Sequence, residues 1–197
     1  MKKMKNSKVQ QIEFSSVLFD ALFGLVVFFS IDSFMDIKNP LHFIFYLFTL
    51  IIVIHWWLIF KTADDAFGEE VTDSGLDLVI GIIELVFIEY IALTARSFDY
   101  IASCWFLIAL FSVDLLWTLV WRYVGEWKTT NVQHIKSMER ELNSNLKVTF
   151  IGLGMFIIFI ILSQFISPII YTSGFIIFYL FFIILTFRYK IIDIKIF

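Results

Sequence analysis

The sequence predicts an all-α, polytopic integral membrane protein, and two features of its composition carry this prediction. Of the 197 residues, 60% are hydrophobic and 19% are aromatic, whereas apolar residues make up roughly 45–50% of a soluble domain. The apolar residues also gather into long runs. Six of these runs reach the length of about 20 residues that a bilayer-crossing helix needs. We therefore expect one transmembrane domain, residues 1–197, with six membrane-spanning helices.

The six predicted spans are separated by segments that favour turns. Lys38-Asn39-Pro40 is expected to turn the chain after the first span. Ser167-Pro168 is expected to divide the last hydrophobic block, which is too long for a single crossing. The predicted spans are about 14–35, 41–61, 76–96, 99–122, 147–166 and 173–190.

The distribution of basic residues predicts the orientation of these spans. If the N-terminus is inside, 13 of the 15 Lys and Arg residues fall on the cytoplasmic side, and only Lys38 and Arg96 fall outside. Cytoplasmic loops of membrane proteins carry such an excess of Lys and Arg. We therefore expect both termini to be cytoplasmic.

The longest predicted loop, about 123–146, is then cytoplasmic as well. Val132, Ile135, Leu142 and Leu146 recur in it at helical spacings, with charged residues between them. This pattern is typical of an amphipathic helix that lies on the membrane surface or on a partner subunit. A solvated linker helix explains it equally well.

Five ionisable residues lie at membrane depth inside otherwise apolar runs. Because a charge in hydrocarbon is costly, such residues usually face a protein interior or a water-filled path. Asp20, His55 and Asp114 are expected in the cytoplasmic half of the membrane, and Glu89 nearer the outer side. Glu84 and Glu89 are five residues apart and point about 140° away from each other on a helix.

Two interpretations of this set remain open. In the first, the carboxylates line a path for cations or protons, and His55 titrates near neutral pH. In the second, the residues form a buried hydrogen-bond cluster that locks helices together, for example with Asp20 accepting from His55 or from the indole of Trp56. The second interpretation is the better one for any single residue, and the first gains when the set is considered together.

The last two predicted spans differ from the first four. No Asp, Glu, Lys, Arg or His occurs between Val148 and Phe187. We therefore expect spans one to four to enclose the polar interior, and spans five and six to face acyl chains or to close an oligomer. Gly152 and Gly154 could allow close contact between helices.

Several classes of protein are disfavoured. The single cysteine, Cys104, cannot form an intramolecular disulfide or a CxxC site. The chain has three histidines and none of the hydrolase, metalloprotease or phosphate-loop motifs, so we expect no enzyme, cofactor or metal site. The net charge of −3 and the lack of a basic block argue against a nucleic-acid partner.

The segment Leu18-Phe19-Asp20-Ala21-Leu22-Phe23-Gly24-Leu25 resembles the first-helix signature of the prokaryotic relatives of the endolysosomal potassium channel. The run that ends in His55-Trp56-Trp57 is similar to that family's second span. The resemblance implies a six-span subunit in a prokaryotic plasma membrane, assembled as a tetramer around a central pore. It also implies that Asp20 anchors the first helix against its neighbours and that Leu25 narrows the pore.

Three functional hypotheses follow. The first is an oligomeric channel for monovalent cations such as potassium, with an apolar constriction at Leu25. The second is a proton-coupled carrier that uses Glu84, Glu89 or Asp114. The third is a scaffold or partner subunit that does not transport. The expected partners are the lipid bilayer, monovalent cations and further copies of the chain.

Overall fold

The computed structural model describes residues 20–67, 75–123 and 132–189, and this part of the chain is helical, with no strand. The all-α prediction is confirmed there. A helix over residues 20–32 is followed by the short 3-10 helix η1 (Ser33–Asp36). The remaining helices are α2 (Pro40–Phe67), α3 (Gly75–Ser97), α4 (Tyr100–Tyr123), α5 (Val132–Leu162) and α6 (Pro168–Arg188).

Four of these helices are long and apolar enough to cross a membrane, namely α2, α4, the Met138–Leu162 part of α5, and α6. The helix α3 is not among the four, and it carries Glu84, Glu89 and Arg96. Residues 14–19 of the first predicted span and residues 190–197 lie outside the described part of the chain. The structure thus supports a membrane protein, while six spans and the side of the termini remain predictions.

Local sequence explains where the helices begin. Asn39 precedes Pro40, and its side-chain oxygen accepts a hydrogen bond of 2.9 Å from the backbone N–H of His42. Asp99 caps α4 in the same way through the N–H of Ala102, also at 2.9 Å. Such caps satisfy backbone donors that a helix leaves free at its start. Between α3 and α4, Phe98 has a φ of 56°, which lets the chain reverse within a few residues.

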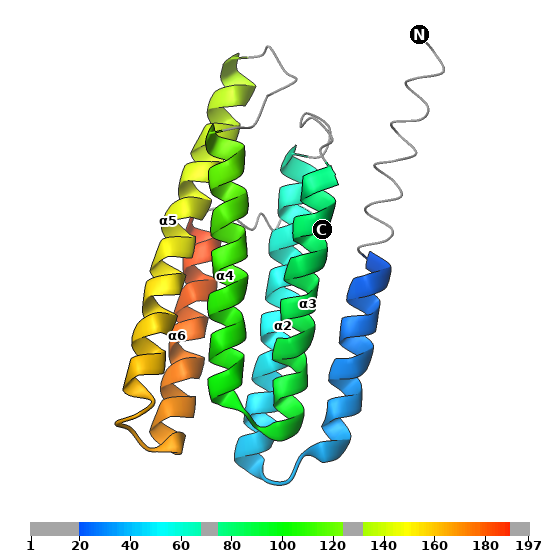
Figure 1. Ribbon diagram of the computed structural model, residues 1–197, viewed down its shortest axis with the longest axis vertical. Helices are drawn as coiled ribbons and strands as arrows, with labels where there is room; N and C mark the ends of the chain where they lie inside the picture. Colours follow the sequence, from blue (N-terminus) through cyan, green and yellow to red (C-terminus); the bar gives the residue numbers. More distant parts are fainter. Residues whose placement is uncertain (1–19, 68–74, 124–131, 190–197) are drawn as a thin grey trace.

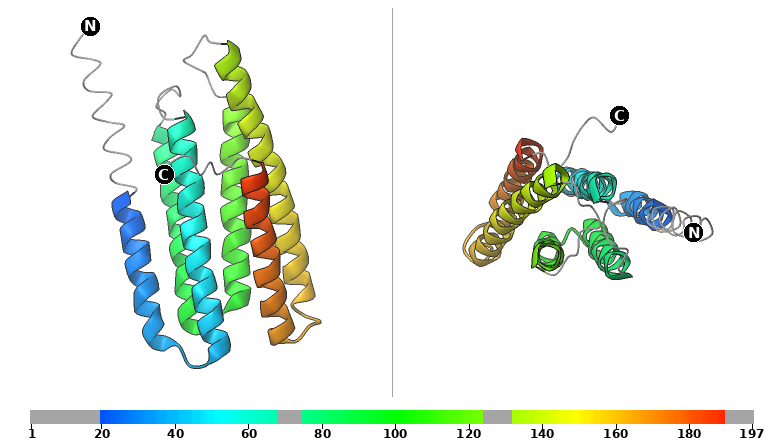
Figure 2. Two further views of the ribbon diagram at one scale, coloured as in Figure 1. Left: turned by 180° about the vertical axis from the view of Figure 1, so that it is seen from behind. Right: turned by 90° about the horizontal axis from the view of Figure 1, so that it is seen from above.

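The helices run antiparallel to their neighbours in sequence and form an elongated bundle (Figure 1). In the view along the bundle, α3 and α4 lie side by side, α4 neighbours α5, and α2 contacts α6, so that α2 to α6 form a closed group (Figure 2). The 20–32 helix lies at the edge of this group. We call the two ends of the bundle the Arg122 end and the Arg96 end.

Aromatic side chains fill the centre of the bundle. Phe111 of α4 packs edge-to-face on Phe182 of α6 at 4.7 Å and on Trp56 of α2 at 5.4 Å, and it stacks on Phe156 of α5. Edge-to-face and offset ring pairs of this kind are favourable beyond the area they bury. Further buried aromatics from α2 and α6 are Phe45, Phe48, Tyr171, Phe175 and Tyr179.

This core corrects the prediction that spans five and six face only lipid or an oligomer. The helix α6 buries one side of its surface, through Phe175, Tyr179 and Phe182, at the centre of the bundle. The sequence was misleading because α6 carries no charge before its last residue, Arg188, and apolar side chains suit a protein core as well as they suit lipid. The helix at the edge is the first one.

The structure also differs from the predicted linker at 123–146. Residues 124–131 lie outside the described part, but from Val132 onward the segment is the first part of α5 and continues without a break into the predicted fifth span. Met138 and Leu142 are buried against this same chain, at 2% exposure each. The periodic apolar residues therefore pack inside the molecule, and the segment is not a separate helix lying on a membrane surface.

Candidate functional site

The most polar buried contact in the described bundle surrounds Asp114, at the interface of α4 and α5. The side chain of Asp114 is 7% exposed. The amide of Asn145 donates to its two oxygens at 3.1 and 3.4 Å, and the hydroxyl of Thr149 donates to one of them. The same amide donates to the hydroxyl of Thr118 at 2.8 Å. Three donated hydrogen bonds therefore converge on one carboxyl group.

Helical spacing explains why these residues meet. Asp114 and Thr118 are four residues apart on α4, and Asn145 and Thr149 are four apart on α5, so each pair lies on one helix face. The two helices run antiparallel and pack along most of their shared length (Figure 1). The polar face of α4 that carries Asp114 and Thr118 thus meets a matching polar face of α5.

Glu84 brings a second carboxyl group to this place from α3. It is half-buried, and it lies close enough to Asp114 for the two carboxyl groups to interact electrostatically. None of the ion pairs found among the described residues involves either acid. We call Glu84, Asp114, Thr118, Asn145 and Thr149 the Asp114 site.

Glu84 and Asp114 are two interacting acids without a basic partner among the described ion pairs. Like charges at close range disfavour ionisation of both groups, so one proton or one cation stabilises the pair. The site could bind a cation through its oxygens or exchange a proton with water. Among the described residues, no group of three or more His, Cys, Asp and Glu is placed to hold a metal ion.

His55 lies in a different network, between α2 and α6. Its Nε2 is 2.9 Å from the hydroxyl of Thr186, and its Nδ1 is 3.0 Å from the hydroxyl of Tyr179. The Thr186 hydroxyl donates its own proton to the carbonyl of Ile183 at 2.7 Å. It must therefore accept from Nε2–H, which leaves Nδ1 to accept from Tyr179. We call His55, Tyr179 and Thr186 the His55 network.

The His55 network matches the locking interpretation rather than the ion-path interpretation. Both ring nitrogens of a neutral imidazole are satisfied, and the network joins α2 to α6. The partner considered for His55, Asp20, takes no part in it. Trp56 is 3% exposed and packs on Phe111.

The other predicted site residues lie apart from both places. Asp20 is the first described residue of the edge helix and pairs with Lys61 of α2 at 2.9 Å, with a side-chain exposure of 47%. Leu25 is 52% exposed on the same helix. Glu89 is half-buried on α3, on a different face from Glu84. The five ionisable residues therefore do not form one cluster, and only Glu84 and Asp114 come together.

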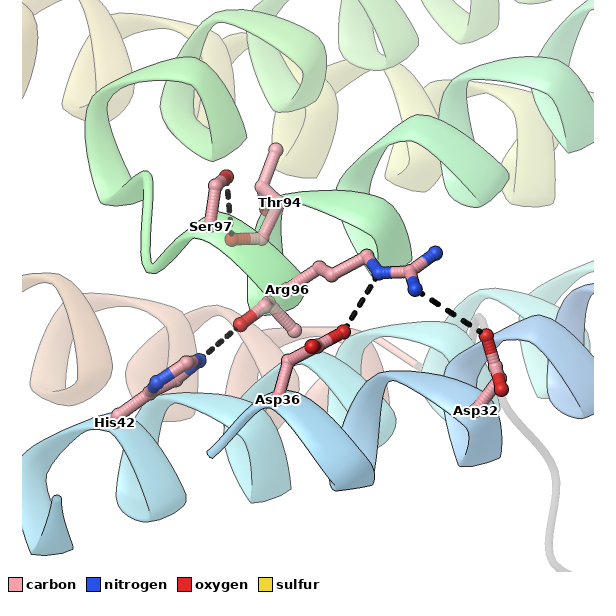
Figure 3. A network of polar contacts seen from close by, with 7 residues as sticks. Asp32, Asp36, His42, Thr94, Arg96 and Ser97 are labelled. Atoms are coloured by element: carbon pink, nitrogen blue, oxygen red, sulfur yellow. Dashed lines mark hydrogen bonds and ion pairs between the residues drawn. The ribbon is translucent and has the colours of Figure 1, made fainter. Parts of the chain in front are cut away.

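A polar network at the Arg96 end was not anticipated as a site (Figure 3). Arg96 of α3 binds Asp36 of η1 at 2.7 Å and reaches Asp32 at 3.6 Å. The ring of His42 hydrogen-bonds the carbonyl of Ala95 beside it. In the sequence, two features indicate this network. Asp32 and Asp36 are four residues apart, and Arg96 is the one arginine expected on the outer side.

Sequence reasoning also missed the neutral partners of Asp114 and His55. Asn145 and Thr149 stand at the border of the predicted linker and the fifth span, where polar residues are unremarkable. Thr186 and Tyr179 belong to a stretch with no Asp, Glu, Lys, Arg or His between Val148 and Phe187. The only signal was their helical spacing, which says that they share a face but not what they face.

Together, the apolar helices and the buried polar contacts define a helical membrane protein, in which polar groups join neighbouring helices. Comparison with protein-family models, with curated proteins and with solved structures found no match.

Proposed function

We propose that the protein translocates cations or protons across a membrane and that the Asp114 site is the point at which they bind. The observation that carries this proposal is the meeting of Glu84 and Asp114 inside the bundle without a basic partner among the described ion pairs. Structure alone does not require a second acid there, because Asn145 and Thr149 already join α4 to α5 through Asp114. Intramembrane acids of this kind are typical of ion and proton routes.

The bundle itself supports a route that is not permanently open. On the side of Asp114 toward the Arg96 end, Leu107, Leu110 and Phe111 are fully buried. Close packing of this kind leaves no room for a continuous column of water. A protein that exchanges ions at a buried acid behind such a barrier fits the carrier hypothesis, or a channel that must first open.

Flux measurements on purified protein in liposomes test the proposal. We expect uptake driven by a proton, potassium or sodium gradient, and we expect Asp114→Asn and Glu84→Gln to reduce it by at least roughly tenfold, since each removes a charge from the binding point. Glu89→Gln is the matched control, because it makes the same chemical change on the same helix but on another face. Flux equal to that of empty vesicles, or full flux in Asp114→Asn, would contradict the proposal.

The oligomeric channel with a constriction at Leu25 is the second candidate. It is favoured by one observation, the position of the 20–32 helix at the edge of the bundle (Figure 2), with Leu25, Phe28 and Ile31 more than half exposed. If copies of this helix surround a pore, Leu25→Ala should raise flux and Leu25→Trp should suppress it. A tetramer in mild detergent would support this candidate. A monomer that still transports would exclude it.

A further inference from the structure

A pocket opens at the Arg122 end, between the end of α4 and the first turns of α5. Its volume is about 220 Å³, and Arg122, Tyr123, Glu139, Leu142 and Asn143 line it. The guanidinium of Arg122 donates a hydrogen bond to the side-chain oxygen of Asn143, so a polar contact joins the two helices at the mouth. A pocket of this size with polar walls can hold several waters.

Polar contacts continue from this pocket toward Asp114 along the same helix interface. On α4, Thr118 lies one turn from Arg122 and Asp114 one turn further. On α5, Asn145 lies two residues beyond Asn143 and bridges Thr118 and Asp114. Thr118 is fully buried. The polar contacts thus form one series, from the water-accessible end to the buried acid.

Beyond Asp114 the same face of α4 is apolar. Leu110, four residues away in the direction of the Arg96 end, is 0% exposed, as is Leu107. Thr118 and Leu110 are therefore equally buried and equally distant from Asp114 along the helix, but one lies on the polar side and the other on the apolar side. The polar side chains next to Asp114 on this face of α4 therefore lie only toward the Arg122 end.

The chemistry of the site favours a proton over a metal cation. A metal ion needs free oxygen lone pairs, whereas an amide and a hydroxyl already donate to the oxygens of Asp114. The mouth of the pocket is lined by one basic and one acidic side chain, Arg122 and Glu139, so its charges do not separate protons from metal cations. The charged groups that face the route are then Glu84 on α3, Arg122 on α4 and Glu139 on α5.

We infer that the Arg122 pocket is the entry to a one-sided proton route that ends at Glu84 and Asp114. This inference rests on the proposed function and specifies its substrate. A proton from water binds a carboxylate oxygen of the pair and gives one neutral acid beside one carboxylate. Release to water restores both carboxylates, so that no other group changes its charge.

Cysteine accessibility in lipid nanodiscs tests the route without measuring transport. The probe is 2-sulfonatoethyl methanethiosulfonate, which needs water to reach a thiolate. We expect Thr118→Cys to react at least roughly tenfold faster than Leu110→Cys, because a thiol in apolar surroundings stays protonated and inert. Asn143→Cys on the pocket wall is the positive control. The unaltered protein is the blank, since its single cysteine, Cys104, lies within the apolar core cluster and away from the polar contacts of this route.

The transported species is tested separately, in liposomes with an internal pH-sensitive dye and with potassium and sodium replaced by N-methylglucamine. Proton uptake under these conditions is expected, together with its loss in Asp114→Asn. Equal reaction of Thr118→Cys and Leu110→Cys would overturn the route, and potassium or sodium flux without proton flux would overturn the substrate. If Thr118→Cys reacts selectively and no ion of any kind is transported, the proposed function fails while the water-accessible route stands.

Discussion

The Asp114 site and the His55 network both bury polar side chains between helices. They differ in whether the neighbouring groups satisfy the hydrogen-bonding atoms and the charge of the buried side chain. In the His55 network, two hydroxyls satisfy both nitrogens of a neutral ring. In the Asp114 site, donors converge on an acid, and a second acid, Glu84, interacts with it electrostatically. A balanced network is what a lock between helices needs. An unbalanced one costs stability and is therefore the better candidate for function.

The largest effect on stability is expected in the balanced network. His55→Leu removes the partner of both Tyr179 and Thr186, so that the Tyr179 hydroxyl loses its acceptor and the Thr186 hydroxyl loses its donor in the core. We expect a loss of about 2–4 kcal/mol of unfolding free energy, since each unsatisfied buried group costs about 1–3 kcal/mol. Unfolding in mixed micelles measures it, with Ile54→Leu on the exposed side of α2 as the control. A loss no greater than that of the control would show that the network does not hold α2 to α6.

Substitution of Gly152, where α5 approaches both α4 and α6, should give the next largest loss of stability. A Cβ at Gly152 of α5 would meet Phe111 of α4 at 2.9 Å and Phe182 of α6 at 3.0 Å. Gly152→Ala should therefore cost about 1–3 kcal/mol, as overpacking usually does. Gly154→Ala is the matched control, because nothing lies within 4 Å of its added carbon. The control should be neutral or slightly stabilising, since alanine favours helix.

Should Gly152→Ala prove as harmless as Gly154→Ala, the rings of Phe111 and Phe182 must yield easily. The close approach of α5 to α4 and α6 would then be looser than the structure indicates. Measuring proton flux in the same variants would show whether the packing of this junction also controls access to the Asp114 site, which lies on the α4–α5 interface.

Substitution of Asp114 should change the unfolding free energy little and transport strongly. Asp114→Asn keeps the shape and can still accept from Asn145 and Thr149, while it removes a buried charge. We expect a change in unfolding free energy of less than about 1 kcal/mol, because replacing a buried charge by a neutral group is often neutral or stabilising. A loss greater than that of His55→Leu would reverse the comparison and make Asp114 the lock.

The sequence predicted the helical class because hydrophobic length is a local property that a bilayer constrains strongly. It also predicted Asp114 as a buried residue of α4 and His55 as a buried residue of α2, since ionisable residues stand out in apolar runs. It did not predict their partners. Asn145, Thr149, Tyr179 and Thr186 are neutral and come from distant segments, so their roles depend on which helices are neighbours.

Helix neighbours were the harder problem for a physical reason. Lipid and protein interiors are both apolar, so the sequence of a helix such as α6, whose only charge is the terminal Arg188, does not show which one it contacts. Because of the same ambiguity, the first helix was expected to help enclose the polar interior, although it lies at the edge of the bundle. The periodic residues of the expected 123–146 linker also indicated a helix, as found from Val132 onward, but could not show that Met138 and Leu142 pack within the chain.

The smallest effect on stability is expected at the exposed network of the Arg96 end (Figure 3), which sets the scale for the two buried regions. Arg96→Gln removes both ion pairs that join η1 and the 20–32 helix to α3. Exposed ion pairs contribute little because water and salt screen them, so we expect the unfolding temperature to fall by less than about 2 °C.

The local effect of Arg96→Gln should be larger than its effect on global stability. Hydrogen exchange should become faster in residues 20–36 but not in α4, and 1 M salt should have the same effect on the unaltered protein as the substitution. Lys38→Gln is the control, as it removes a positive charge at the same end outside these ion pairs. Unchanged exchange in residues 20–36 would mean that Val26 and the stacking of Phe23 on Trp57 hold the edge helix without the charges.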